Sequence, residues 1–197
     1  MKSVLISIKP QWCEKIASGE KTIEVRKSAP KEVPFKCYIY CCKDNAQEIV
    51  LLKDWKNRFS FGDYRNADGH FYDVANRTVI GEFICNKVDE YKYDYGCGYY
   101  PGDGVDIDDD TILETAINRE DINIYAKGKT LYGWHISDLK IYDKPKELSE
   151  FKKSCPTKEK GDCLACDCLA DNDYGGICTN FVTRPPQSYM YVEEICL

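Results

Sequence analysis

Short apolar runs, separated by proline, glycine and charged residues, predict a chain of strands and short helices. Runs rich in β-branched and aromatic residues, which favour strands, occupy residues 3–8, 21–27, 36–42, 78–88 and 131–142. In the second run polar and apolar residues alternate. This pattern predicts that Ile23 and Val25 face inward, whereas Lys21, Glu24 and Arg26 lie at the rim or on the outer face.

Helices are expected between these strands. Pro10 suits the first turn of a helix whose apolar face carries Trp12 and Cys13 and which ends at Gly19. Residues 111–118 and 119–127 predict two further short helices, the first capped by Asp110. Residues 89–110, rich in tyrosine and aspartate, are expected to be irregular. The alternation of strands and short helices indicates an α+β domain around a small mixed β-barrel.

Length and composition restrict the class of protein. The chain has 197 residues, of which 43% are hydrophobic, enough for a packed core. No window approaches 18 consecutive apolar residues, and the N-terminus lacks the pattern of a signal peptide. We therefore expect a cytoplasmic protein without membrane association, whose 12 cysteines are mostly reduced.

Charge is distributed unevenly along the chain. The formal net charge is −6, but residues 1–60 carry 12 Lys and Arg against 7 Asp and Glu, whereas the remainder carries 15 against 26. The overall charge excludes a globally basic nucleic-acid-binding face. The basic N-terminal part can still meet phosphate, although both parts could equally be ordinary solvated surface.

A cysteine-rich segment gives the strongest chemical signal. Five cysteines lie within 24 residues, at positions Cys155, Cys163, Cys166, Cys168 and Cys178. The C-x-x-C pair Cys163 and Cys166, together with Cys155 and Cys178, predicts a structural zinc site, and Cys168 makes the choice of ligands ambiguous. Free or disulfide-forming thiols and an iron–sulfur cluster are the alternatives. The change in composition divides the chain into a barrel, 1–150, and a metal-stapled extension, 151–197, packed on it.

The remaining cysteines need no metal. Strand positions predict that Cys37, Cys41, Cys42 and Cys85 are small core residues, and Cys13 lies on the apolar face of the first helix. His135, in the last predicted strand, is expected to be a half-buried histidine with its hydrogen bonds satisfied rather than a catalyst.

A second cluster of charged residues precedes and opens the 21–27 strand. It consists of Gly19-Glu20-Lys21-Thr22-Ile23-Glu24-Val25-Arg26, with Lys9 and Trp12 expected to converge on it from the preceding elements. Such charges often pair with each other and do nothing else. However, a guanidinium fork beside an indole face also suits a phosphate or a nucleobase.

This cluster resembles the signature of the ASCH domain family, which is close to G-x-K-x-x-E-x-R. The resemblance extends to Ser7-Ile8-Lys9-Pro10 upstream and to the stretch from Trp134 to Pro145. Together with Arg184 to Ser188, these regions look like a subgroup found in phages and low-GC Gram-positive bacteria that has a cysteine-bearing tail. The resemblance implies a PUA-like barrel with an RNA- or nucleoside-binding cleft.

The resemblance also implies candidate catalytic residues. Some small relatives remove the acyl group from N4-acetylcytidine with a lysine, a threonine and a glutamate. Lys21 matches the lysine, Glu24 stands where those enzymes carry the threonine, and Glu114, or alternatively Glu120, is the candidate for the glutamate. Thr22 matches a non-catalytic position.

Three functions follow from these observations. The first is binding of RNA or a modified nucleoside through Lys9, Trp12, Lys21, Thr22, Glu24 and Arg26, with tyrosines of 91–100 as a stacking wall. The second is an N4-acylcytidine amidohydrolase in which Lys21 polarises the amide and Glu24 or Glu114 is the general base; a carboxylate beside two cations is a poor base, which favours Glu114. The third is binding of a protein partner through the cysteine-rich tail.

Overall fold

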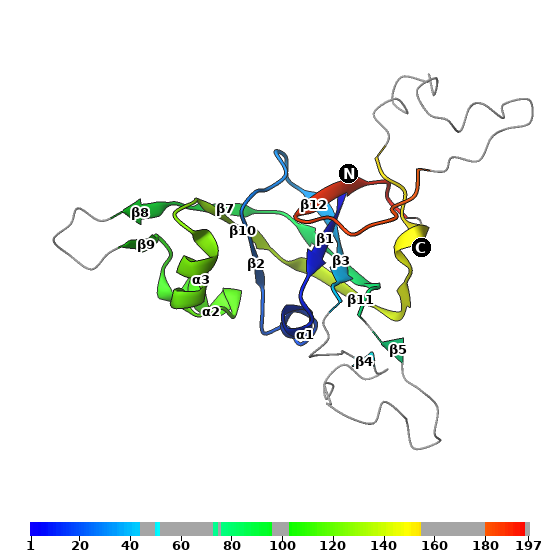
Figure 1. The fold of residues 1–197 in the computed structure, drawn as a ribbon, viewed down its shortest axis with the longest axis horizontal. Helices are drawn as coiled ribbons and strands as arrows, with labels where there is room; N and C mark the ends of the chain where they lie inside the picture. The colour runs from blue at the N-terminus through cyan, green and yellow to red at the C-terminus, as the bar shows by residue number, and fades with distance from the viewer. Residues whose placement is uncertain (44–49, 52–72, 75, 96–102, 155–179, 196–197) are drawn as a thin grey trace, which may run out of the picture.

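The computed structural model describes residues 1–43, 50–51, 73–74, 76–95, 103–154 and 180–195. Strands account for more of these residues than helices do, and three α-helices accompany them, which confirms the mixed α+β class (Figure 1). No helix in these ranges is long and apolar enough to cross a membrane.

The larger sheet has five strands, with β3 at its centre. In spatial order they are β11 (Ser137–Lys146), β6 (Val79–Cys85), β3 (Phe35–Cys41), β1 (Lys2–Ile8) and β12 (Tyr189–Val192). β1 runs parallel to β3, and the other neighbours are antiparallel. Val4, Ile6 and Ile8 face one apolar cluster, whereas Leu5 faces another. Burial on both faces explains why β1 reads as a continuous apolar run.

The smaller sheet contains three strands and positions the site described below. It consists of β2 (Ile23–Arg26), β10 (Leu131–His135) and β7 (Val88–Tyr91), in the order β2-β10-β7. Two short antiparallel strand pairs lie outside these sheets: β4 (Val50–Leu51) with β5 (Asp73–Val74), and β8 (Tyr93–Tyr95) with β9 (Asp103–Val105). A 3-10 helix, η1 (Leu148–Glu150), follows β11.

Two predicted strands each divide between the two sheets. The 78–88 run becomes β6 and β7, and the 131–142 run becomes β10 and β11, which extends to Lys146 through Pro145. The breaks lie side by side, since the amide of His135 donates to the carbonyl of Lys87 at 3.1 Å. Just beyond the second break Asp138 has a positive φ of 48°. Each of these two segments therefore contributes one strand to each of the two larger sheets. The sequence predicted a small mixed β-barrel, but the described strands do not close into one.

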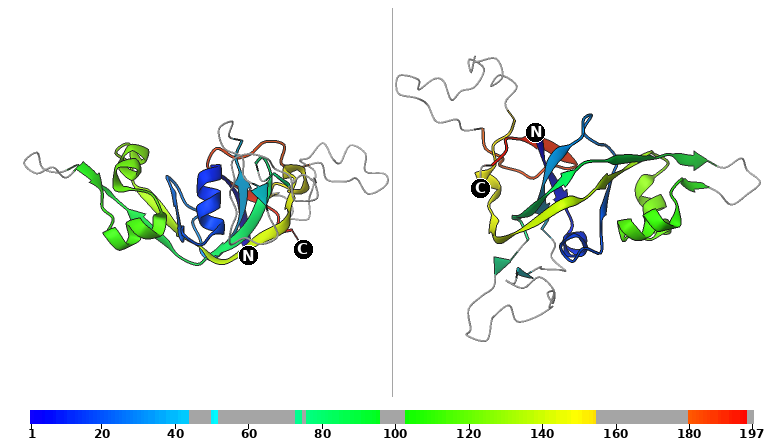
Figure 2. Two further views of the ribbon diagram at one scale, coloured as in Figure 1. Left: turned by 90° about the horizontal axis from the view of Figure 1, so that it is seen from below. Right: turned by 180° about the vertical axis from the view of Figure 1, so that it is seen from behind.

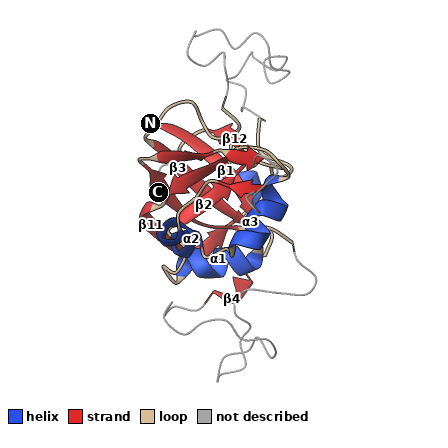
Figure 3. Cartoon of the chain, turned by 90° about the vertical axis from the view of Figure 1, so that its left-hand side faces the viewer, coloured by secondary structure: helices blue, strands red, loops and turns tan. Residues whose placement is uncertain are grey.

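All three helices lie on one side of the strands (Figures 2 and 3). They are α1 (Pro10–Ala17), α2 (Asp109–Thr115) and α3 (Arg119–Ala126), in agreement with the predicted helices. The cap of α2 is Asp108 rather than Asp110, because the Asp108 carboxylate accepts the amide of Thr111 at 2.8 Å. In Figure 2 (left), β2 lies between α1 on one side and the α2–α3 pair on the other.

The described residues beyond position 150 return to the larger sheet. β12 pairs with β1, and Phe151, Val182 and Val192 share one apolar cluster with Leu5 and Tyr38. The predicted zinc ligands Cys155, Cys163, Cys166 and Cys178, as well as Cys168, lie outside the described residues. The structural zinc, the extension that it would staple and the boundary at residue 150 therefore stay predictions.

Candidate functional site

A cleft of about 460 Å³ opens between α1, β2 and α3, a volume typical of small-molecule pockets. Its lining is drawn from elements far apart in the sequence. The lining residues are Ser7, Ile8, Lys9, Gln11, Trp12, Glu24, Val25, Arg26, Ile117, Asp121, Tyr125 and Gln187. Four of the predicted site residues, Lys9, Trp12, Glu24 and Arg26, are among them.

The floor of the cleft carries a buried ion pair on β2. The Nε atom of Arg26 lies 2.9 Å from Oε1 of Glu24, and both side chains are less than one-tenth exposed. Arg26 also donates through Nη2 to the carbonyl of Ser7 at 2.7 Å, which ties β2 to the end of β1. The sequence placed Glu24 and Arg26 at the rim or outer face. That placement is wrong, because Arg26 packs toward the end of β1 and Glu24 lies against the buried Lys21, so both side chains are buried.

Lys21 lies beneath the cleft rather than in its lining. Its side chain is fully buried, and Nζ donates to the carbonyl of Thr115 at 2.7 Å and lies 3.5 Å from Oε2 of Glu24. The same Nζ lies 5.5 Å from the centre of the Trp12 ring. Burial lowers the pKa of Lys21, although the Glu24 carboxylate opposes this shift. Its ammonium group thus neutralises Glu24 from below while Arg26 does so from the side.

Two aromatic rings face the cleft from opposite helices. Trp12 of α1 is half-buried, and its ring packs against the main apolar cluster. Tyr125 of α3 remains 40% exposed, and Nζ of Lys27 lies 4.8 Å from the centre of its ring. Exposed aromatic faces in a concave site are the feature on which nucleobases stack.

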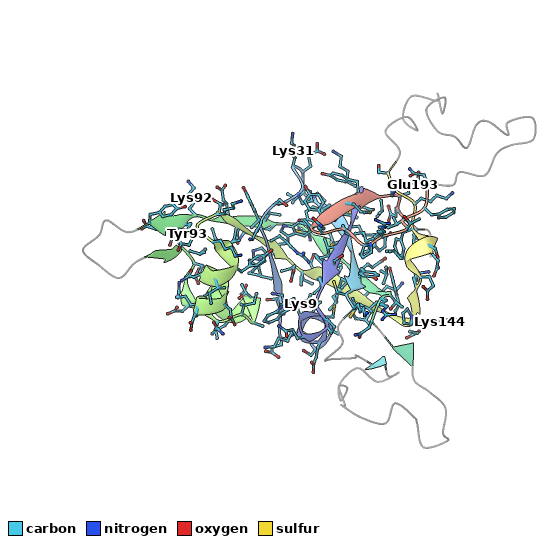
Figure 4. All side chains as sticks on the ribbon, viewed as in Figure 1. Lys9, Lys31, Lys92, Tyr93, Lys144 and Glu193 are labelled. Atoms are coloured by element: carbon cyan, nitrogen blue, oxygen red, sulfur yellow. The ribbon has the colours of Figure 1, made fainter. Side chains whose placement is uncertain are left out.

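Cationic charge at the mouth of the cleft comes from Lys9. Its side chain is exposed at the start of α1, and no ion pair within the described ranges engages it. Figure 4 labels Lys9 beside α1, on the opposite edge of the molecule from Lys31. Unlike Arg26, which is held by Glu24, Lys9 is available to a phosphate.

The sequence did not reveal the contribution of α3. The N-cap residue Asn118 accepts the amide of Asp121 at 2.8 Å and donates through Nδ2 to Oδ2 of Asp121 at 2.8 Å. This reciprocal bonding begins the helix and fixes the Asp121 carboxylate. Tyr125 lies four residues further on, on the same helical face. The capping pattern was visible in the sequence, but its position beside β2 was not.

Solved structures with this arrangement of strands and helices exist. A serine-to-alanine variant of ASCH from Zymomonas mobilis has a TM-score of 0.50 and 14% sequence identity, over 98% of this chain and 89% of that chain. The chain has the ASCH fold. ASCH from Z. mobilis itself gives a TM-score of 0.47 at 15% sequence identity, over 98% of this chain and 89% of that chain. Its tyrosine-to-phenylalanine variant gives a TM-score of 0.48 at 14% sequence identity, over 98% of this chain and 92% of that chain. No family model and no curated protein matches the chain.

The other predicted site residues lie elsewhere in the ASCH fold. Thr22 is exposed and joins β2 to α2, since its amide donates to the carbonyl of Glu114 at 2.9 Å. The side chains of Glu114 and Glu120 are exposed, and neither residue lines the cleft. Tyr91 is buried, whereas Tyr93 and Tyr95 pack on each other on β8, so none of these three lines the cleft; Tyr99 and Tyr100 lie outside the described residues.

The histidine and most of the strand cysteines lie as predicted. Nε2 of His135 lies 2.7 Å from Oδ2 of Asp89, and the ring is half-buried. Cys13, Cys37, Cys41 and Cys85 are buried, and Cys42 is half-buried. Within the described ranges no group of three or more His, Cys, Asp or Glu residues is arranged to hold a metal. Cys97 and Cys196 lie outside those ranges.

Proposed function

We propose that the chain is an ASCH family protein that binds RNA or a modified nucleoside in the cleft between α1 and α3. One observation carries the proposal. A single cleft of about 460 Å³ combines two aromatic rings, Trp12 and Tyr125, with an available cation, Lys9, and two carboxylates. A stacking face with polar groups around it suits a base, and a cation at the mouth suits the attached phosphate.

The polar groups divide between support and recognition. Glu24 and Arg26 neutralise each other at 2.9 Å, and Lys21 is fully buried under them. Because these three residues pair with one another, the floor of the cleft offers a ligand polar atoms in defined positions but little unpaired charge. The ligand's charge is met at Lys9 instead.

Variants of the cleft wall that leave Lys21, Glu24 and Arg26 unchanged test this proposal, with thermal melting to confirm that each variant is folded. Trp12→Ala and Lys9→Ala are compared with Lys31→Ala, which removes an exposed lysine at the far edge of the molecule (Figure 4). Titration with a short single-stranded RNA is expected to show weaker binding for both cleft variants and unchanged binding for Lys31→Ala. Loss of the Lys9 charge should also reduce the dependence of affinity on salt. Equal binding by all variants would place the ligand outside the cleft.

A second proposal is deacylation of N4-acetylcytidine-type nucleosides. The supporting observation is the buried Lys21–Glu24 pair, in which the pKa of the lysine is lowered by burial and the carboxylate faces the cleft. Incubation with N4-acetylcytidine, followed by chromatography for cytidine, tests it. Product that forms with the wild-type chain and disappears in a Glu24→Gln variant shown by thermal melting to be folded would support hydrolysis. Absence of product at high protein concentration would leave binding as the function.

A further inference from the structure

The two carboxylates in the cleft differ in their freedom to bind a ligand. Oε1 of Glu24 faces Nε of Arg26 at 2.9 Å, and Oε2 faces Nζ of Lys21 at 3.5 Å. Both of its oxygens are therefore engaged by cations. Asp121 has no ion pair within the described ranges, and its only side-chain partner there is the amide group of Asn118 on Oδ2. Its Oδ1 is free to accept from a ligand.

The position of the Asp121 carboxylate is fixed before any ligand arrives. The backbone amide of Asp121 donates to Asn118 at 2.8 Å, while its side chain accepts from the same residue at 2.8 Å. A preorganised acceptor loses little entropy on binding, so its hydrogen bond contributes more fully to selectivity.

The aromatic walls cannot supply this selectivity. Every base offers a π face, so stacking on Trp12 or Tyr125 tolerates any sequence. Discrimination between bases needs a polar atom that meets the base edge in the plane of the ring. Asp121 lines the same cleft as Tyr125 and lies one helical turn before it on the same face of α3.

We infer that Asp121 makes the cleft select a base with an exocyclic amino group over uracil, an inference that rests on the proposed function. An ionised carboxylate only accepts hydrogen bonds. The amino group of cytosine donates two and pairs well with a carboxylate. The single ring N–H of uracil lies between two carbonyl oxygens, which repel an approaching carboxylate. Cytosine and uracil match in size, so this difference is isolated in the pyrimidine pair.

The experiment is isothermal titration of the full chain with CMP and with UMP. The wild-type chain is expected to bind CMP about tenfold more tightly than UMP, which corresponds to about 1.4 kcal/mol. Asp121→Asn is expected to reduce that ratio to below about threefold. Glu120→Gln is the matched control, because it removes a neighbouring carboxylate on the same helical turn that does not line the cleft, and it should keep the wild-type ratio.

The possible outcomes distinguish failure of the inference about Asp121 from failure of the proposed function. Equal affinity for CMP and UMP in the wild-type chain, or a ratio unchanged in Asp121→Asn, would overturn the role of Asp121 while leaving the cleft a nucleotide site. If neither CMP, UMP nor a short RNA binds, the proposed function itself fails. Thermal melting of Asp121→Asn and Glu120→Gln shows whether a changed ratio of CMP to UMP affinity comes from loss of structure. The ratio measured for the wild-type chain tests the inference without any variant.

Discussion

Nε of Arg26 lies 2.9 Å from Oε1 of Glu24 on the edge strand β2, with both side chains nine-tenths buried. Edge strands usually expose their charges, and burial of an ion pair without further partners is costly. Here the pair has two further partners: the carbonyl of Ser7 accepts from Arg26, and Lys21 lies against the second oxygen of Glu24. The charged floor of the cleft is thus a connected network rather than a single pair.

Glu24→Gln is predicted to destabilise the fold. The substitution leaves two buried cations without their counter-charge, for which the expected loss is about 3 kcal/mol of the free energy of unfolding. Urea denaturation measures it. Glu20→Gln removes an exposed partner, 2.7 Å from Lys15, and should cost less than about 1 kcal/mol. Equal losses for the two variants would show that the buried network contributes no more to the free energy of unfolding than an exposed ion pair.

Lys21 should give the stability of the chain a distinct pH dependence. Its pKa is lowered by burial in the folded state, so between the folded and unfolded values the unfolded chain binds more protons. Stability from this group therefore rises with pH across that window, and its penalty is fully present at lower pH.

Comparison with Lys21→Met isolates this contribution from the other titrating groups. Between about pH 8 and about pH 10 the free energy of unfolding should rise more steeply, or fall less steeply, for the wild type than for the variant. Chemical denaturation across that range measures both slopes. Parallel curves would mean that the pKa of Lys21 is the same in both states.

Gly133→Ala is predicted to destabilise the smaller sheet by about 1–3 kcal/mol. A Cβ at this position of β10 would collide with the hydroxyl and ring of Tyr91 on β7. The Tyr91 hydroxyl is buried and has no hydrogen-bond partner among the described residues, so Tyr91→Phe alone should cost little. In the double variant part of the loss should be recovered because the hydroxyl is gone. Strictly additive effects in thermal melting would exclude this contact as the cause.

The sequence predicted the helices and most strands, since their apolar periodicity and caps are local. The sequence-based prediction failed where contacts with distant segments determine which side chains are buried and where a strand ends. The alternation in 21–27 placed Glu24 and Arg26 outward, because nothing local shows that this face of β2 packs toward the end of β1 and the buried Lys21. The runs at 78–88 and 131–142 read as single strands, because the step between sheets at Lys87 and Ile136 depends on pairing partners, not on composition.

The candidate site was predicted only in part for the same reason. Lys9, Trp12, Glu24 and Arg26 lie within 18 residues of one another, so the sequence grouped them. Asp121 and Tyr125 come from a helix almost a hundred residues later, and only the fold brings that helix to β2. The strand at Tyr189–Val192 was also missed, although its aromatic and β-branched residues are typical of strands.

The most direct test of the account is to map where a nucleic acid contacts the chain. Ultraviolet crosslinking of a short oligocytidylate to the wild-type protein, followed by peptide mass spectrometry, identifies the contacting side chains. We predict crosslinks at Trp12 or Tyr125, and their loss when unlabelled CMP competes. Crosslinks confined to exposed aromatics away from the cleft, such as Tyr191 on β12, would contradict the assignment of the cleft as the binding site.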